Sequence, residues 1–542
     1  FGARDNCARA LECDPEKVNF CQIQVGGSFG GKGDHLLRML SCVGTRVTGR
    51  AVRVTLSRED SLRYHNKRHP FEMHEKLAVA ADGRILGLQN YLLGDGGAYT
   101  YFSTRIMPQA VCYSSGPYVI PNFDSTGVVA FTNNVSSGAM RGYGIPQMMF
   151  AMESHVDDIA RRLNIPPLRL RQMNLMEVGY RDSFSKNENY FDSFNQCIKK
   201  GMEYIDYDRK LEEFSHDTGD IRRGIGMAVF WYNTAVWPIS LESSSCRMVL
   251  NQDGSVQLQL AETEIGQGAD TAFSQMAAEE LGIPLKKVHI ISAQDTDVTP
   301  FGTGAYASRQ TYVGGFAVQQ TARIMKERIL NYAHGLTRMT VHNLDIEDGY
   351  IININNSRRL MSLAELATTA LYSLEHSQHI TAESTYQVKS NAYSFGCSFA
   401  EVEVDIPLCK VKLVNMINVH DCGRLINPAL AAAQVHGGMS MAIGYGLSEQ
   451  LLYDKKTGRP LNNNLLDYKL STTMDHPHLE AQFVENYEPT SAYGTKALGE
   501  PPATSGAPAI RNAVLNATGV EIDTAPLTPH VLFERFREEG LI

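Results

Sequence analysis

The chain has 542 residues, of which 43% are apolar and 20% are charged, so it has room for roughly three to four domains and the composition of a globular protein with a large core. Its formal net charge of −9, with no run of basic residues, argues against a nucleic acid or an anionic membrane surface as the partner. No apolar stretch reaches the length that spans a bilayer.

The start of the chain and its cysteines bear on the cellular compartment and on possible metal sites. The chain begins at Phe1 without an initiator Met or a signal-peptide pattern, which is consistent with a start inside a longer chain. None of the ten cysteines belongs to a Cys-x-x-Cys pair, so the usual zinc and iron–sulfur spacings are absent. We therefore expect reduced, mostly buried thiols in a cytoplasmic protein.

The first part of the chain predicts strands and helices around a glycine-rich loop. Residues 20–25 alternate like a strand and lead into 26–32, where four glycines around one Phe would let backbone amides approach a ligand closely. Glycine-rich loops also serve as plain turns, and this pattern alone does not separate the two. The elements predicted next are a helix at 35–43, a strand at 50–56, a hairpin of 71–79 with 85–94, and a strand at 128–134.

A second loop, 137–147, leads into a helix with one apolar face. Pro146 suits the first turn of a helix, and apolar residues then recur three and four positions apart, at 149, 152, 156, 159 and 163. Arg141 lies just before this helix between small residues, where it could hold a buried anion. An ordinary turn with Arg141 in a surface ion pair fits the same pattern.

Residues 181–222 are polar and weakly patterned, and we expect them to connect two large units, 1–180 and 223–542. In the second unit the pattern predicts a strand at 224–230, a hairpin of 247–250 with 256–260, a helix at 271–281, a strand at 288–292, a helix at 313–333, a hairpin of 399–405 with 410–419, and helices after Asn427 and at 510–514. Mixed helices and strands in both units place the fold in the α+β class.

Five loops have a similar composition. Each places an amide or a cation among small residues, mostly at or before the start of a helix. They are 26–32, 141–147, 266–268, 305–310 and 434–438. Helix N-termini and exposed backbone amides bind anionic groups. Together these loops could surround a large cofactor that bears phosphate.

Glu500 stands in a stiff segment near the C-terminus. Gly499 before it removes side-chain bulk, and Pro501 and Pro502 after it rule out an α-helix at this point. A carboxylate among small residues on such a loop is typical of a general base in a close-fitting pocket, with its pKa raised toward working pH. A solvated Glu on a helix-entry loop is the competing interpretation.

Six segments occur in the order GGSFGGK, AMRGYGIPQ, TEIGQGAD, GAYASRQ, AAQVHGG and KALGEPP. With them, the chain from about Val25 to its C-terminus resembles the molybdenum-binding subunit of the xanthine dehydrogenase/aldehyde oxidase family. The segments 234–238, 296–301 and 524–542 are similar to the bacterial xanthine dehydrogenases within it. The resemblance implies two large mixed α/β units of the molybdenum-hydroxylase cofactor-binding fold, packed with the cofactor between them.

The resemblance also implies an oxidative hydroxylase that carries molybdenum on a molybdopterin, with or without a cytidine nucleotide. In this family a glutamate matching Glu500 takes a proton from a metal-bound hydroxide, whose oxygen attacks an electron-poor carbon, and water resupplies the oxygen. The dithiolene of the pterin holds the metal, so no protein ligand to it is expected. The histidines that are therefore expected to be structural are His65, His69, His74 and His420.

The resemblance implies a role for each of several further residues. Gln267 matches the glutamine that hydrogen-bonds the apical oxo ligand, Phe29 and Gly30 match a loop beside the same oxygen, and Arg141 matches an arginine on the cofactor side of the pocket. The other residues expected to bind the cofactor are Gly266, Ala307, Ser308, Arg309, Gln310, Gln434 and Gly499.

The substrate follows less directly from the resemblance. Tyr143 takes the place of a phenylalanine that stacks on the substrate ring, although a core tyrosine is the alternative. Gly33 and Gln109 stand where animal xanthine oxidases carry the glutamate and arginine that read a purine, and Trp237 could substitute by stacking. A purine, hypoxanthine or xanthine, is the first expectation, and a nicotinate-like N-heterocycle or an aldehyde is the alternative.

The family passes its electrons to a [2Fe–2S] cluster and to FAD, and this chain has neither the cysteine spacing nor a flavin segment for them. We therefore expect an iron–sulfur subunit and an FAD subunit as partners in a higher oligomer. A non-catalytic scaffold subunit is the competing class of function, against which Glu500, Gln267 and Arg141 argue. A serine hydrolase is excluded because 241–245 and 438–441 lack the glycines of a nucleophile elbow.

Overall fold

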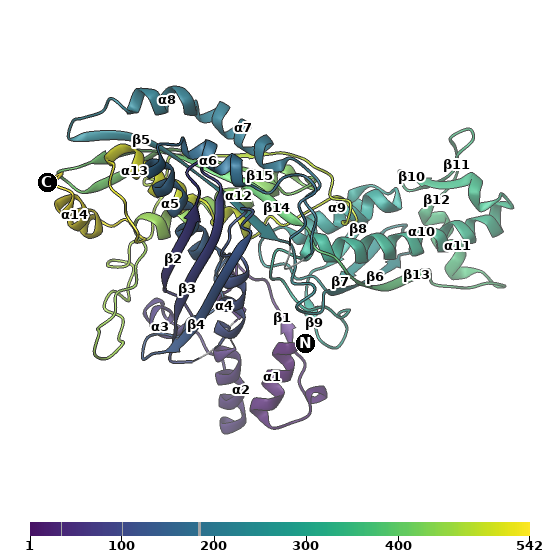
Figure 1. Cartoon of the computed structure of the whole chain (residues 1–542). Helices are drawn as coiled ribbons and strands as arrows, with labels where there is room; N and C mark the ends of the chain where they lie inside the picture. Colours follow the sequence, from purple (N-terminus) through teal and green to yellow (C-terminus); the bar gives the residue numbers. More distant parts are fainter. Residues whose placement is uncertain (34, 100, 183–185) are drawn as a thin grey trace.

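The computed structural model describes residues 1–33, 35–99, 101–182 and 186–542. Its centre is a four-stranded sheet in the order β16 (His478–Phe483), β15 (Lys410–Asp421), β14 (Tyr393–Asp405) and β5 (Ile221–Asn233) (Figure 1). The β14–β15 pair confirms the hairpin predicted for this region, and β5 joins β14 antiparallel. The central strand β14 is buried along most of its length, because helices cover both faces of the sheet.

The helix that follows the Glu500 segment, α13 (Gly506–Thr518), packs on β5 and β14. Gly224 and Gly226 make this close packing possible, because a Cβ atom on either would run into the main chain of Ala513. The strand and helix are thereby held in close contact. The position of the Glu500 segment is therefore set by the central sheet.

The opposite face of the central sheet is covered by α7 (Ser193–Ile205), which is followed by α8 (Tyr207–Phe214). Both helices lie in the stretch 181–222, for which the sequence predicts only a polar connection, and that prediction misses them. Residues such as Phe194 and Ile198 are buried in the main core. The apolar stripe was hidden in a composition rich in charged and amide residues, which face outward. The division into 1–180 and 223–542 stays a prediction.

A three-stranded sheet, β2 (Phe71–Val79), β3 (Ile85–Gly97) and β4 (Asn122–Phe131), lies on one side of the centre. Its β2–β3 hairpin confirms the prediction, and β4 runs parallel to β3 after the crossover helix α4 (Ser103–Cys112). From β4 the chain enters α5 (Ile145–Leu163), whose apolar face is buried as its spacing predicts.

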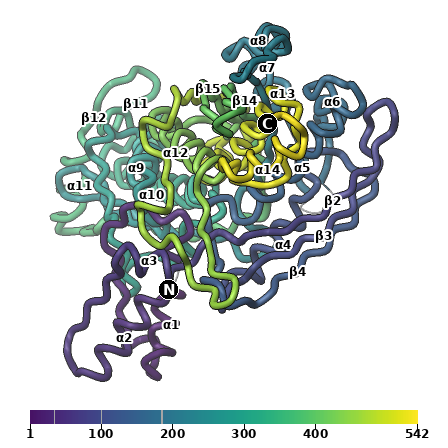
Figure 2. Tube along the Cα trace, turned by 90° about the vertical axis from the view of Figure 1, so that its left-hand side faces the viewer, coloured from purple at the N-terminus to yellow at the C-terminus, as the bar shows by residue number. Residues whose placement is uncertain are grey.

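A second outer lobe lies on the opposite side of the centre (Figure 2). Its main sheet has the order β13 (Thr381–Gln387), β6 (Ser243–Leu250), β7 (Val256–Leu260) and β8 (Val288–Ile291). Two helices pack against each other there, α9 (Ala269–Leu281) and α10 (Gly315–Thr337). The lobe ends in β10 (Leu344–Glu347), β11 (Tyr350–Asn353), β12 (Arg358–Ser362) and α11 (Leu363–Tyr372).

The N-terminal helices α1 (Gly2–Leu11) and α2 (Leu36–Thr48) lie at the lower edge of Figure 1, and α3 (Arg58–Tyr64) lies above them. The strand predicted at 50–56 is wrong, because this segment pairs with no described strand and Val52 instead lies against Gly44 of α2. The strand predicted at 20–25 shrinks to β1 (Cys21–Gln22), which pairs with β9 (Gln294–Asp295). A segment with a strand pattern forms a stable strand only when it pairs with another strand, and neither segment has a long partner strand.

The remaining helices are α6 (Pro167–Asn174), α12 (Pro428–Leu447) and α14 (Pro529–Glu538). Asn427 caps α12 as its position predicts, since its side chain accepts a hydrogen bond from the backbone of Leu430. No helix among the described residues is both long and apolar enough to cross a membrane.

Candidate active site

The loop 26–32 joins two of the other loops through main-chain hydrogen bonds. The amide of Gly27 donates to the carbonyl of Ile265 (2.8 Å), and the amide of Arg141 donates to the carbonyl of Phe29 (2.8 Å). Gly30 has a φ of 107°, and a Cβ atom there would run into the carbonyl of Ala139. The glycines of this loop therefore allow close approach between main chains, as its composition suggests.

Arg141 connects this loop to two others near the C-terminal half. Its guanidinium donates to the main-chain carbonyl of Gly499 and, at 2.8 Å, to that of Gln434, and it lies 5.9 Å from the centre of the Phe29 ring. The side chain is buried, and burial lowers its pKa to about 10. The alternative of a surface ion pair for Arg141 is therefore wrong.

Glu500 lies where these loops meet the loop 305–310. Its carboxylate accepts hydrogen bonds from the amide of Gly142 (3.3 Å) and the hydroxyl of Ser308 (3.3 Å), while its own amide donates to the Ser308 oxygen (2.9 Å). The residue is half-buried, so the interpretation as a solvated surface Glu does not hold. Burial raises the pKa of Glu500, and hydrogen bonds and the charge of Arg141 oppose that rise.

Gln267 and Gln310 complete the connection between the loops. The amide nitrogen of Gln267 donates to the side-chain oxygen of Gln310 (2.6 Å) and to the carbonyl of Thr263 (2.9 Å), and its oxygen accepts from the amide of Ile265 (2.7 Å). Four of the five predicted loops therefore form one hydrogen-bonded ring with Glu500, and the fifth, 434–438, is attached to this ring through Arg141.

Two residues predicted to bind the cofactor already bond other residues of this chain. The Arg309 guanidinium is fully buried and pairs with Glu242 and Glu262 (2.9 Å to the latter), so its side chain belongs to the core of the second lobe. The amide of Gly266 donates to the carboxylate of Glu264 (2.6 Å). Sequence reasoning missed these three glutamates, although Glu264 stands only two residues before Gly266.

Glu264 also satisfies the N-terminus of α9. Its carboxylate accepts from the amides of Gly268 (3.2 Å) and Asp270 (3.0 Å). A carboxylate in this place takes the role expected of an anionic ligand. The expectation that this helix end would bind a cofactor anion is therefore not supported by the structure.

Left-handed backbone is concentrated around Glu500. Non-glycine residues with φ between 48° and 67° occur in the loops that surround it, namely Phe29, Tyr143, Ala235, Ala307 and Ser308. Each such residue costs about 1–3 kcal/mol and persists only when its surroundings impose it. Strain of this kind gathers at functional sites, which supports the choice of this region from an observation independent of residue type.

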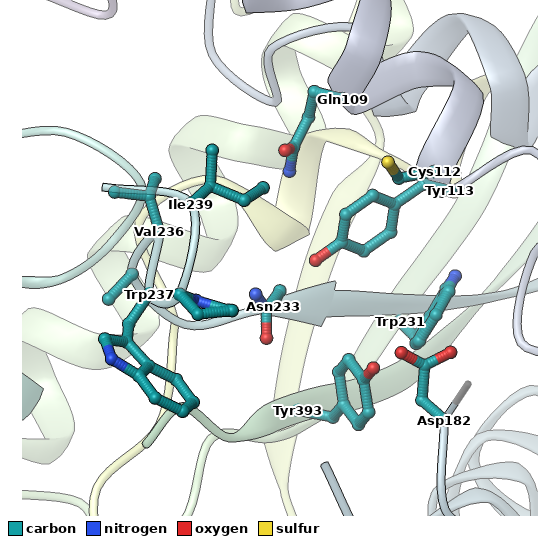
Figure 3. A pocket seen from close by; sticks show the side chains of 12 residues that line it. Gln109, Cys112, Tyr113, Asp182, Trp231, Asn233, Val236, Trp237, Ile239 and Tyr393 are labelled. Carbon is teal, nitrogen blue, oxygen red and sulfur yellow. The ribbon is translucent and has the colours of Figure 1, made fainter. Parts of the chain in front are cut away.

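The three residues expected to contact the substrate do not form one group. Tyr143 is half-buried, faces the charge of Glu500 and packs its ring against the edge of Phe102 (6.4 Å between centres), so it is not a plain core tyrosine. Gln109 and Trp237 line a separate pocket at the end of β5 (Figure 3). That pocket holds about 20 Å³, room for roughly one water molecule.

The walls of this pocket are aromatic and carry amide and acidic groups. They include Tyr113, Asp182, Trp231, Asn233 and Tyr393. The ring of Tyr113 lies 4.8 Å from that of Trp231 and 6.4 Å from that of Tyr232. A flat ring could stack on such walls only if the pocket widened, since its present volume is below that of a purine.

The histidines occupy separate structural positions. His69 bonds Ser103 (2.7 Å) and His420 bonds Asn418 (2.8 Å), and burial lowers their pKa values to about 4 and about 3. The cysteines are free thiols, and six of the ten are buried.

Comparison with known proteins gives matches over nearly the whole chain. Two models described as molybdopterin cofactor-binding domain match residues 1–175 and 200–477. A xanthine dehydrogenase molybdenum-binding subunit from Escherichia coli O157:H7 is 41% identical over 538 residues, which is 98% of this chain and 71% of that protein. An aldehyde oxidoreductase from Megalodesulfovibrio gigas is 27% identical over 98% of this chain and 56% of its own length.

Solved structures agree with these matches. The crystal structure of quinoline 2-oxidoreductase from Pseudomonas putida 86 superposes with a TM-score of 0.92 at 26% identity, over 99% of this chain and 71% of that one. The relatives thus share one fold while their names refer to several different substrates.

Proposed function

The chain belongs to the xanthine dehydrogenase family of molybdenum hydroxylases, and from that premise we propose that it hydroxylates a purine, hypoxanthine or xanthine, with water as the oxygen source. The observation that carries the proposal is the place of Glu500. It is an acid with a raised pKa, and its carboxylate accepts hydrogen bonds from two of the five loops, 141–147 and 305–310.

The residues around Glu500 fit a phosphate-bearing cofactor. Arg141 is a buried cation whose described hydrogen bonds go to an amide oxygen and to main-chain carbonyls rather than to a carboxylate, so its charge is available to an anion nearby. The side chains and main-chain groups proposed to hold the molybdopterin are those of Phe29, Gly30, Arg141, Gln267, Ala307, Ser308, Gln310, Gln434 and Gly499. Gly266 and Arg309 contribute through loop shape alone.

When bound, the cofactor supplies the oxygen-transfer and two-electron chemistry. The chain supplies positioning and a proton acceptor. A Glu500 oxygen accepts the proton that must leave, because burial has raised its affinity for protons while the donors from Gly142 and Ser308 keep the carboxylate oriented. The charge of Arg141 opposes the rise in the pKa of Glu500 and so favours the ionised carboxylate.

The substrate assignment rests on chemistry near Glu500. Tyr143 offers a ring and a hydroxyl beside the acid, which suits a flat heterocycle with polar edges. Gly33 and Gln109 carry no charge, which favours a nicotinate-like N-heterocycle or an aldehyde as the second candidate.

The partners follow from the E. coli relative, which is named as the molybdenum-binding subunit of a dehydrogenase. We propose that electrons leave through an iron–sulfur subunit and an FAD subunit in a multi-subunit complex. The pterin is proposed in either its simple or its cytosine dinucleotide form.

A turnover panel tests the substrate. The purified complex should contain about one molybdenum per chain, as one cofactor site requires, and kcat/KM should be highest for hypoxanthine or xanthine among these two purines, nicotinate and an aromatic aldehyde. Activity on nicotinate or the aldehyde but on neither purine would overturn the purine assignment and leave the family unaffected.

Gly30→Ala should weaken cofactor retention. The substitution places a Cβ atom against the carbonyl of Ala139 at a φ of 107°, which costs about 1–3 kcal/mol and displaces the loop from Arg141. Molybdenum per chain and thermal stability should both fall. Gly26→Ala is the control in the same loop, because nothing lies within 4 Å of its Cβ position. Equal molybdenum content in the two variants would contradict the role of Gly30.

A further inference from the structure

Tyr232 lies near the end of β5, beside Glu500, and none of the patterns in the sequence pointed to it. Its side chain is 1% exposed. Its hydroxyl faces the Glu500 carboxylate, which already accepts hydrogen bonds from Gly142 and Ser308. A buried phenol needs a hydrogen-bond partner, because an unpaired polar group there would be costly, and this carboxylate is the acceptor that it faces.

The end of β5 is held firmly against the loops of the site. Tyr232 pairs with Ser394 in the central sheet. Two residues later the hydroxyl of Thr234 accepts from the amide of Ala497 (2.9 Å), and the amide of Ala235 donates to the carbonyl of Ala307 (3.0 Å). The strand therefore fixes the phenol relative to both loops that carry Glu500 and Ser308.

The neighbours of Tyr232 connect Glu500 to the pocket of Figure 3. Trp231 and Asn233 on either side of it line that pocket, and its ring packs 6.4 Å from that of Tyr113, which lines it too. The Tyr232 hydroxyl faces the acid. A shift of Tyr232 would therefore alter both the acid and the pocket wall.

We propose that Tyr232 is a positioning residue for Glu500, whose hydroxyl donates to the carboxylate, holds it in one orientation and favours its ionised form. This inference rests on the proposed role of Glu500 as the base. Its physical basis is that a hydrogen bond to a charged acceptor is worth more than one to a neutral acceptor, so the donor stabilises the carboxylate over the carboxylic acid.

The surroundings allow the titration of Glu500 to be observed separately. The other titratable groups that face it are Arg68, Arg141 and Tyr143. Burial lowers the pKa of both arginines, to about 10 for Arg141, and raises the pKa of Tyr143 and Tyr232. Arginine and tyrosine side chains ordinarily titrate above neutrality, so an acid limb in kcat/KM is assigned to Glu500.

Tyr232→Phe in the complete complex tests the proposal. Loss of the donor raises the pKa of Glu500, so the acid limb of kcat/KM should move to higher pH by about one unit, the shift expected for one hydrogen bond to a charged group. Molybdenum per chain should not change. An acid limb at the wild-type pH would overturn the proposal.

Tyr118→Phe is the matched control. Tyr118 is also 1% exposed, and its hydroxyl donates to another buried glutamate, Glu153, outside the five loops. This variant loses the same kind of bond and some stability, and its acid limb should stay in place. If both variants shift the limb equally, the effect is a general loss of stability and the proposal is wrong.

A second measurement separates this inference from the proposed function. Infrared difference spectra against Glu500→Gln follow the protonation of Glu500 without turnover, and the midpoint should rise in Tyr232→Phe even if the purine assignment fails. Where Tyr232→Phe folds poorly, difluorotyrosine at position 232 keeps the shape and makes the phenol a stronger donor. The midpoint should then fall, and an unchanged midpoint would contradict the proposal.

Discussion

Glu500→Gln should slow hydroxylation at least ~10²-fold, the usual scale for the loss of a general base, while molybdenum per chain stays as in the wild type. The amide keeps the size of the side chain and one acceptor oxygen, so it retains the bond to Gly142 or to Ser308, but it takes up no proton. Single-turnover kinetics in the purified complex measure the effect directly. Wild-type turnover in this variant would remove Glu500 from the mechanism.

The pH dependence of the wild type gives the same residue a second test. Burial raises the pKa of Glu500 above its ordinary value, and the base works only when it is deprotonated. The rate constant kcat/KM should therefore decline as pH falls through this raised pKa, at a higher pH than an exposed glutamate would give. Glu488→Gln is the control, because Glu488 is buried and bonds Thr490 rather than a site residue.

Arg309→Met should destabilise the protein by about 3–5 kcal/mol, the scale for removing one partner from a buried ion pair. Glu242 and Glu262 would both remain buried and lose their countercharge. The main chain of 305–310 would lose its attachment at the same time, so molybdenum content should fall with stability. The drop in the thermal midpoint, measured by calorimetry, checks the prediction.

Two further variants show whether the buried charges cause this effect. Arg323→Met breaks an exposed pair with Glu280, which should cost about 1 kcal/mol or less. Replacing Arg309, Glu242 and Glu262 together with apolar residues should restore much of the stability, since no charge is then left unpaired. A triple variant no more stable than Arg309→Met would contradict this account.

Much of the local structure was predictable from short-range patterns. The β2–β3 and β14–β15 hairpins, the buried face of α5 and the cap of α12 all follow from periodicity and turn residues within a few positions. The two wrong predictions of secondary structure have one cause. The segment 50–56 has a strand pattern but no partner strand, and the apolar stripe of α7 is hidden in a polar composition. In both cases the structure depends on which other parts of the chain are available for packing.

The candidate site likewise has features that the sequence predicts and features that depend on tertiary contacts. The amino-acid sequence by itself determined the five loops, the stiff proline segment after Glu500 and the family to which these motifs point, because such features are written in residues next to one another. Only the tertiary structure decided that four of the loops form one hydrogen-bonded ring with Glu500, that Arg309 and the α9 terminus are satisfied by glutamates, and that Tyr232 faces Glu500. Those contacts join residues far apart in the chain, and their geometry depends on how the central sheet brings the segments together.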